Sequence, residues 1–297
     1  MAGYIIYNGF WNPGGPSDPV CRLQDAAAGR GCILTPLPNT ELIARFESGV
    51  AVEGLNGEDY ALFWDKDVRL ARAMEACGMR LYNSAAGVAL CDDKAATHLC
   101  LAAAGLPMPR TLAAPMTYLQ MDAGPSAHFL EEAEQRLGFP MVVKECFGSL
   151  GGQVYLARNR EELARLSQDM AARPFLAQEF IGASAGRDVR LYMVGGRLAA
   201  AMERRSDVDF RANVGAGGRA APYAPPQEEI RLAAACCRLL GVGFAGVDLL
   251  HDKDGRPLVC EVNSNAYMAA LTDCTGVDVA GCIVDYVLER EAAHENG

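Results

Sequence analysis

Two acidic residues and an asparagine near the C-terminal end have the types and spacing of a divalent-cation site. Asp248 lies in the segment FAGVDLL, and Glu261 and Asn263 lie in LVCEVNSN. The dipeptide Asp254-Gly255 separates these segments. Asp-Gly between two strand-like runs is a strong signal for a β-hairpin with a two-residue turn. The sequence therefore predicts that Asp248 and Glu261 face each other on paired strands.

The register of this hairpin decides which side chains share a face. A two-residue turn pairs Lys253 with Arg256, and counting outward places Asp248 opposite Glu261. Because side chains alternate along a strand, Asn263 shares the face of Glu261. The other face is expected to be apolar and to carry Val247, Leu249, Cys260 and Val262.

Two adjacent carboxylates repel each other unless a cation lies between them. Oxygen ligands of this kind suit Mg²⁺ held together with nucleotide phosphates. The alternative is an acidic hairpin edge that faces water. If the metal site is real, Asp248→Asn is expected to abolish metal-dependent nucleotide binding and leave the fold intact.

Composition narrows the class of protein. The chain has 297 residues, 51% of them hydrophobic, and a formal net charge of −10. A net negative charge argues against non-specific nucleic-acid binding but allows a small anion in a local basic pocket. No apolar run approaches the roughly 20 residues of a membrane helix. The 11 cysteines, an odd number in a chain far longer than a disulfide-rich secreted domain, predict reduced thiols and a cytoplasmic protein. The absence of a C-x-x-C pair argues against metal binding by cysteine.

The first ninety residues alternate short apolar runs with helical patterns, which predicts a small α/β domain with parallel strands over residues 1–90. The expected strands are Tyr4–Tyr7, Cys32–Thr35, Ala61–Trp64 and Arg80–Tyr82. The expected helices are Asp18–Arg30, Thr40–Ser48 and Val68–Cys77.

A second unit, expected over residues 91–290, has the pattern of an α+β domain with antiparallel strands. It begins with a helix that Asp92 or Asp93 can cap and that ends before Gly105 and Pro107. Further strands are expected at Met141–Glu145, Gln153–Leu156, Leu176–Ile181, Val189–Val194 and Leu198–Met202. Further helices are expected at Phe129–Leu137, Glu161–Ala172, Glu228–Leu240 and Val277–Leu288.

A lysine followed by glycines predicts a phosphate-binding loop. Lys144 ends the strand-like run PMVVKE, and the glycine-rich segment that contains Gly151 and Gly152 follows. The amine supplies a point charge, and backbone N–H groups can close over phosphate oxygens. Lys94 lies in the first turn of its helix, where a positive charge opposes the helix dipole. The alternative for both lysines is an ordinary solvated side chain.

Three further segments contain groups that suit a nucleotide. The strand that includes Gln178-Glu179-Phe180-Ile181 can offer backbone groups to a base. Asp188 and Arg190 share one strand face, where the acid can bind a ribose hydroxyl and the arginine a phosphate, or the two can pair with each other. Arginine forks also suit phosphoryl oxygens, and such arginines cluster in one stretch with an asparagine: Arg204, Arg205, Arg211 and Asn213.

Taken in this order, these segments resemble the ATP-grasp superfamily, and most closely the RimK-like α-L-glutamate ligases, which include the ribosomal protein S6 modification enzyme. The resemblance covers about residues 92–290. It implies an ATP-grasp fold preceded by a Rossmann-like pre-ATP-grasp domain. Within the ATP-grasp domain it implies a lid subdomain at about 110–182 and a catalytic subdomain at about 183–290.

The resemblance also implies roles for individual residues. Lys94 and Lys144 match two lysines that bind ATP phosphates, and Gly151 and Gly152 match the lid. The segment Gln178, Glu179, Phe180 and Ile181 matches the hinge that holds adenine. Asp188 matches the acid that binds ribose, and Arg211 and Asn213 match contacts near the phosphates. Asp248, Glu261 and Asn263 match the ligands of Mg²⁺ or Mn²⁺, usually two ions. The arginines expected to act on the reacting groups are Arg190, Arg204 and Arg211.

The activity that the resemblance implies is ATP-dependent ligation of a carboxylate to an amine through an acylphosphate. The expected partners are a small-molecule or peptide carboxylate and an amino acid such as glutamate, with no nucleic acid or membrane, and members of the family often form oligomers. The alternatives are a kinase, a ligase of another amino acid, and a non-catalytic ATP-binding protein. The family commonly follows E-V-N with S-S-P-G, whereas Ser264-Asn265-Ala266-Tyr267-Met268 follows here, which leaves both substrates open.

Overall fold

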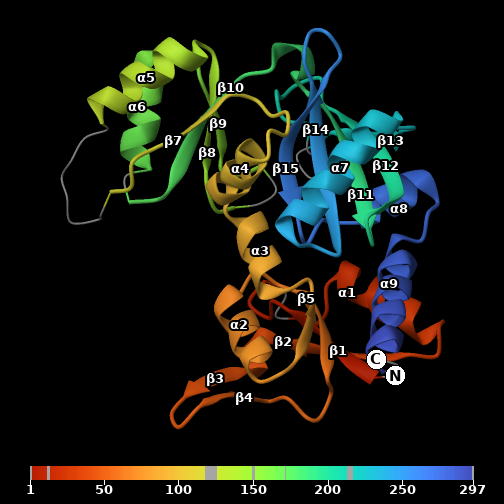
Figure 1. Ribbon diagram of the computed structural model, residues 1–297. Helices are drawn as coiled ribbons and strands as arrows, with labels where there is room; N and C mark the ends of the chain where they lie inside the picture. The colour runs from red at the N-terminus through yellow and green to blue at the C-terminus, as the bar shows by residue number, and fades with distance from the viewer. Residues whose placement is uncertain are drawn as a thin grey trace.

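The computed structural model describes residues 2–11, 14–117, 126–148, 151–170, 172–212 and 217–295, and it is a mixed α/β protein with three main sheets (Figure 1). The first sheet has four parallel strands in the order β2-β1-β5-β6. They are β1 (Ala2–Tyr7), β2 (Ile33–Pro38), β5 (Tyr60–Trp64) and β6 (Arg80–Tyr82). The helices between them are α1 (Asp18–Ala28) and α2 (Val68–Ala76), so the predicted strand–helix alternation is confirmed.

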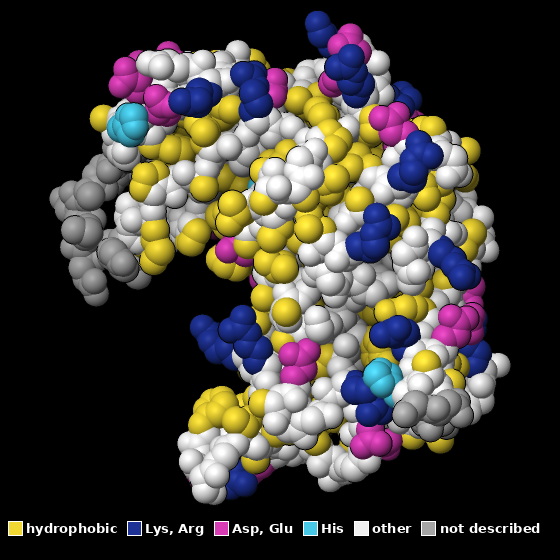
Figure 2. Space-filling view, viewed as in Figure 1, with side chains coloured by type: hydrophobic (Ala, Val, Ile, Leu, Met, Phe, Trp, Pro, Cys, Tyr) yellow, Lys and Arg dark blue, Asp and Glu magenta, His cyan; other side chains and the backbone are white. Residues whose placement is uncertain are grey.

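The helix predicted at Thr40–Ser48 is wrong. A short 3-10 turn, Asn39–Glu41, leads into the hairpin β3 (Ile43–Phe46) and β4 (Val50–Glu53). Glu47, Ser48 and Gly49 connect the two strands, which pair from Ile43 with Glu53 to Phe46 with Val50. Ile43, Phe46 and Val50 are exposed, and Figure 2 shows hydrophobic side chains gathered on this arm.

The second sheet is antiparallel and has the order β7-β10-β8-β9. Its strands are β7 (Thr111–Ala113), β8 (Met141–Glu145), β9 (Val154–Ala157) and β10 (Phe175–Glu179). The helices α5 (Ala127–Leu137) and α6 (Arg160–Asp169) share one buried apolar cluster with this sheet. This part of the chain forms its own lobe, at the upper left of Figure 1.

The third sheet is antiparallel, with the order β13-β12-β11-β14-β15. Its strands are β11 (Arg187–Val194), β12 (Arg197–Arg205), β13 (Arg219–Pro222), β14 (Phe244–His251) and β15 (Pro257–Asn263). The helix α7 (Gln227–Leu240) packs on one face and ends at Gly241, whose left-handed backbone (φ 67°) suits glycine. Two helices precede the second sheet, α3 (Ala85–Asp92) and α4 (Lys94–Ala103), and α4 begins after its N-cap Asp93, as predicted.

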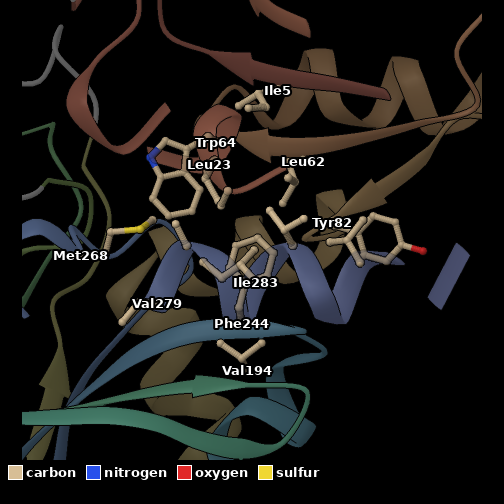
Figure 3. Close-up of a cluster of buried hydrophobic side chains, with 14 of the residues drawn as sticks. Ile5, Leu23, Leu62, Trp64, Tyr82, Val194, Phe244, Met268, Val279 and Ile283 are labelled. Atoms are coloured by element: carbon tan, nitrogen blue, oxygen red, sulfur yellow. The ribbon is translucent and has the colours of Figure 1, made fainter. Parts of the chain in front are cut away.

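The C-terminal helices connect the third sheet to the first. After α8 (Ala269–Thr275), the helix α9 (Val279–Glu295) packs on α1 and on the third sheet. Figure 3 shows side chains of α9 between Phe244 of the third sheet and Leu62 of the first. The chain therefore returns to its N-terminal part, although the sequence places this helix in the second unit. The proposed division at residues 90 and 91 and the subdomain boundaries remain predictions.

A buried carboxylate attaches the end of α9 to the first sheet. Glu291 is 3% exposed and accepts hydrogen bonds from the Arg80 guanidinium (2.6 and 2.9 Å) and the Tyr82 hydroxyl (2.7 Å). Burial opposes ionisation of Glu291, but these donors outweigh it and lower the pKa of the carboxyl.

We expect Glu291→Gln to lower the free energy of unfolding by about 1–3 kcal/mol, a value reduced because the Arg80 side chain is 37% exposed. Urea denaturation at neutral pH measures the effect. Glu289→Gln, an exposed position on the same helix, is the control and should change stability little. Equal effects at both positions would contradict the assignment.

Among the residues that the structure describes, no helix combines the length and the apolar composition that crossing a membrane requires.

Candidate nucleotide and metal site

A cavity of about 470 Å³ opens where the three sheets meet, and residues from all of them line it. Most of the predicted site residues are among its lining. They are Lys94, Lys144, Gly151, Gln178, Glu179, Phe180, Ile181, Asp188, Arg190, Arg204, Arg211, Asp248, Glu261 and Asn263. The tertiary structure therefore brings together segments that span 170 residues of sequence.

The hairpin β14–β15 places Asp248 opposite Glu261, as predicted, but it does so by a different route. The last strand pair is His251 with Pro257, and the Asp252 N–H donates to the Arg256 carbonyl, so three residues form the turn rather than two. A bulge between Asp248 and Leu249 compensates for the extra residue. The two differences cancel at the acidic pair.

The bulge also overturns the face predicted for Cys260. Val247, Leu249 and Val262 are fully buried, as expected of the apolar face. Cys260 instead lines the cavity, with its Sγ 3.6 Å from the Lys144 Nζ. A bulged residue leaves the alternation of its strand, which is why counting by twos failed here.

Two arginines hold the Asp248 carboxylate. Arg190 donates from Nε and Nη2 at 2.7 Å each, and Arg204 donates from Nη2 at 2.9 Å. Burial alone would raise the pKa of this carboxyl, but the two guanidinium groups outweigh it and lower the pKa to about 2. Arg204 also holds Asp188 in a two-bond fork of 2.6 and 2.8 Å. Asp188 and Arg190 therefore pair with other residues rather than with each other.

The donor set fits a hard divalent ion that also binds phosphate. Asp248 and Glu261 are directly paired, and Asn263 follows Glu261 by two residues on the same strand. The Asn263 Nδ2 is buried without a hydrogen-bond partner in the described part of the chain. No hydrogen bond from Nδ2 therefore holds the amide in an orientation that keeps its Oδ1 away from a metal. The described residues contain no group of three His, Cys, Asp or Glu side chains that could hold a metal ion, so phosphate oxygens and water would complete the coordination.

The two predicted lysines are buried in the cavity wall. Lys94, 8% exposed, donates to the Gly148 carbonyl (3.1 Å) and lies 3.6 Å from Glu261 Oε1. Lys144 is 6% exposed, and no carboxylate in the described part of the chain lies within ion-pair distance of its Nζ. A buried ammonium without an anion favours an anionic ligand.

We expect Lys144→Met to weaken ATP binding in the presence of Mg²⁺ by at least about tenfold, since a charge-assisted hydrogen bond contributes about 1.5–3 kcal/mol. The same change should leave the melting temperature of the nucleotide-free protein unchanged or higher, because it removes an unpaired buried charge. Calorimetric titration and thermal denaturation measure the two effects. Lys253→Met in the exposed β14–β15 turn is the control, and a parallel loss of stability and affinity in Lys144→Met would contradict the assignment.

The glycine loop is attached to Arg211. The Arg211 guanidinium donates to the Gly151 carbonyl at 2.6 Å and pairs with Asp209 at 2.7 Å. Gly148 and Gly151 line the cavity, whereas the predicted Gly152 does not. Gly151 has a φ of 75°, which a side chain would strain. Asn213, predicted to act with Arg211, lies outside the described residues.

The predicted hinge follows β10 along the cavity. The Glu179 N–H donates to the Arg110 carbonyl (2.8 Å), and the Glu179 carboxylate accepts from the Arg110 guanidinium, so neither group is free for a base. The Gln178 amide lies 2.9 Å from Thr111 Oγ1 and 3.3 Å from His98 Nε2. Burial, with Lys144 and Lys94 nearby, lowers the pKa of His98 to about 3, which keeps the imidazole neutral.

The first sheet forms a part of the cavity that the sequence motifs do not predict. Its lining there includes Tyr7, Asn8, Trp64, Asp65 and Lys66, together with Asn265 and Tyr267 of the loop after β15. Asn8 and Asp65 directly follow β1 and β5. Polar residues at the carboxyl ends of neighbouring parallel strands were the signal that could have identified them.

Comparison with known proteins agrees with this geometry. Residues 91–287 match the model of the RimK-like ATP-grasp domain. Human β-citrylglutamate synthase B is 37% identical over 224 residues, which cover 75% of this chain and 56% of that protein. Human N-acetylaspartylglutamate synthase A is 33% identical over 235 residues (78% and 58%). A probable α-L-glutamate ligase of Maridesulfovibrio salexigens is 32% identical over 225 residues (73% and 70%).

Solved structures share the fold. The RimK-domain ATP-grasp protein of Sphaerobacter thermophilus superposes with a TM-score of 0.72 at 23% identity, covering 96% of this chain and 99% of that one. The D-alanine–D-alanine ligase of Bacillus anthracis with ATP gives 0.67 at 17% identity and covers both chains fully. The fold and site define an ATP-grasp protein, and this chain belongs to the RimK-like ATP-grasp family. It spans little more than half the length of the two human relatives.

Proposed function

We propose that this protein is an ATP-dependent carboxylate–amine ligase. The observation that carries the proposal is one cavity that combines a buried lysine without an anionic partner and a facing pair of carboxylates. Transfer of a phosphoryl group needs positive charge near its oxygens and precise positioning. The buried lysine, a metal held by the acid pair, and the glycine loop can provide these. The described cavity lining presents no Ser/His/Asp or Cys/His arrangement, and the proposed chemistry needs no nucleophilic side chain.

The proposed ATP position follows the cavity from the hinge to the acid pair. Adenine lies at Gln178–Ile181, and the ribose lies near Asp188. Lys94, Lys144 and the loop at Gly151 contact the phosphates. Arg211 positions that loop through the Gly151 carbonyl. Asp188 must then share its carboxylate between Arg204 and the ribose, because Arg204 already occupies both oxygens.

Asp248, Glu261 and Asn263 are proposed to hold Mg²⁺ or Mn²⁺, as two ions or one. The bound metal would neutralise charge on the phosphate oxygens during transfer. The Asp248 Oδ1 accepts a hydrogen bond from Arg190 alone, so its second lone pair can face the metal while both arginines stay bound to the carboxylate. The Arg190 and Arg204 guanidinium groups line the same cavity and can stabilise charge on the reacting groups.

The proposed reaction has two steps. A substrate carboxylate oxygen attacks the γ-phosphorus, the bond to the β–γ bridging oxygen breaks, and an acylphosphate and ADP form. The nitrogen of an amine then attacks the acyl carbon, phosphate leaves with the bonding electron pair, and the amine gives up a proton. A closed glycine loop would exclude water, which otherwise hydrolyses the acylphosphate.

The relatives favour an amino acid as the amine. Their names describe synthesis of β-citrylglutamate and N-acetylaspartylglutamate and ligation of L-glutamate. We therefore propose glutamate or a similar amino acid, joined to a small carboxylate or a peptide. A cytoplasmic setting, in which the eleven thiols stay reduced, and homo-oligomerisation belong to the same proposal.

A phosphate-release screen tests the function. The purified protein is incubated with ATP, Mg²⁺, each common amino acid, and a panel of di- and tricarboxylates and short peptides. Phosphate release that requires both an amine and a carboxylate supports a ligase. ADP formation that needs no amine would instead indicate a kinase, and ATP binding without ADP formation across the panel would indicate a non-catalytic protein.

A further inference from the structure

The first sheet contributes a crevice to the cavity that the ATP position does not use. In the order β2-β1-β5-β6, the chain continues from β1 to β2 on one side, whereas β5 lies on the other side of β1. The strand order therefore reverses between β1 and β5. Open α/β sheets bind ligands at such a reversal, outside the carboxyl ends of the strands. Asn8 and Asp65 follow these two strands and line the cavity there.

Asp65 is a buried anion without a cation. Asp65 is 5% exposed, and its Oδ1 accepts hydrogen bonds from the Lys66 N–H (2.6 Å) and the Asn8 amide (3.2 Å). The Oδ2 is 3.5 Å from that same amide. The adjacent Lys66 ammonium is turned to Asp92, 2.6 Å away. Within the described chain no ion pair is made by Asp65, and burial raises the pKa of its carboxyl.

A buried acceptor that lacks a hydrogen bond lies beside this carboxylate. Asn265 donates from Nδ2 to the Asp65 carbonyl at 2.8 Å, which fixes its amide. The opposite atom of that amide, Oδ1, is buried and has no hydrogen-bond partner in the described part of the chain. Asn265 follows Asn263 by two residues, so this pair of acceptors adjoins the proposed metal site. Burying the Asp65 charge without a cation and the Asn265 oxygen without a donor is costly unless a ligand supplies both.

We propose that Asp65 and Asn265 bind the primary ammonium group of an amino-acid substrate at the end of the first sheet. An ammonium has one positive charge and three N–H donors, which match the uncompensated carboxylate and the free amide oxygen. A carboxylate or phosphate in this crevice would instead meet a buried like charge. The assignment to a ligase substrate rests on the proposed function, whereas the preference for an ammonium rests on these contacts alone.

Binding measurements test the ammonium site directly. Calorimetric titration of the common amino acids into the wild-type protein, with and without ADP and Mg²⁺, identifies the amino acid that binds most tightly. We expect its analogue with hydrogen in place of the α-amino group to bind at least tenfold more weakly. Asp65→Asn keeps the shape of the side chain and removes its charge. It should weaken binding of the amino acid at least tenfold and leave ATP affinity unchanged.

A matched control separates this role from a general loss of charge or stability. Asp67→Asn makes the same change two residues away, outside the cavity lining, at the N-cap of α2, where asparagine also caps. It should keep wild-type affinity for the amino acid. Equal affinity of wild type and Asp65→Asn would overturn the proposal, as would tight binding of the analogue or failure of every amino acid to bind wild type.

Kinetics then separate the ammonium site from the ligase function and identify the source of the ammonium. A raised KM of Asp65→Asn for the amine substrate, with the KM for ATP unchanged, assigns the site to the attacking amine. A raised KM for an amino acid that supplies the carboxylate assigns it to the activated substrate instead. Amino-acid binding that depends on Asp65, without any phosphate release, would contradict the ligase function and support the ammonium site. Phosphate release with wild-type KM values in Asp65→Asn would support the ligase function and contradict the ammonium site.

Discussion

Replacing Glu261 by glutamine is expected to lower kcat/KM for ATP-dependent phosphate release by a factor of about 10²–10³, the range seen when one charge-stabilising group is lost. Glu261 lines the cavity opposite Asp248 and has Lys94 as its partner at 3.6 Å. Glutamine keeps the size but removes one of the two charges that hold the metal against ATP. Raising the Mg²⁺ concentration should restore part of the loss, because weaker metal affinity is its cause.

A matched change elsewhere in the third sheet provides the control. Glu203 on β12 pairs with Arg187 and Arg205 and lies outside the cavity lining. Glu203→Gln therefore removes the same charge at a position away from the site. It should retain wild-type phosphate release. If Glu261→Gln were as active as Glu203→Gln at low Mg²⁺, the acid pair would not be a metal site.

Asp248→Asn is expected to have a double effect. It should abolish Mg²⁺-dependent ATP binding, and it should also lower the free energy of unfolding by about 3–5 kcal/mol, since breaking a buried ion pair leaves a charge uncompensated. The side chains of Arg190 and Arg204 are 11% and 4% exposed and lose their shared anion. The sequence alone predicts an intact fold for this variant, and the structure revises that expectation. Denaturant unfolding without nucleotide measures the change.

The pH dependence of this variant checks the physical cause. The folded protein lowers the pKa of Asp248 to about 2 from 3.8, so it holds the proton less tightly than the unfolded chain does. The stabilisation is therefore complete above 3.8 and is lost as the pH falls toward about 2. The difference in unfolding free energy between wild type and Asp248→Asn should shrink over that interval. A difference that stays constant across it would show that the carboxylate charge is not the cause.

Local pattern was enough to predict much of the fold. Strand and helix periodicities predicted the alternating first segment and the antiparallel strands after it, and the order of short motifs identified the family. The helix predicted at Thr40–Ser48 failed because a short run can satisfy both periods, and here pairing with β4 decided for the strand. The Asp248–Glu261 pair was predicted correctly although both the turn length and the bulge were missed.

The charges of the site show where sequence reasoning ends. Residue types alone determined that carboxylates, lysines and arginines of the right kinds are present in the order of the RimK-like ATP-grasp family. Only the tertiary structure decided which of them pair, because Asp248 meets Arg190 and Arg204 from 58 and 44 residues away, and Asn265 meets Asp65 from 200. Whether a buried charge is compensated depends on such distant neighbours, and that is what distinguishes the occupied Asp248 from the unpaired Lys144 and Asp65.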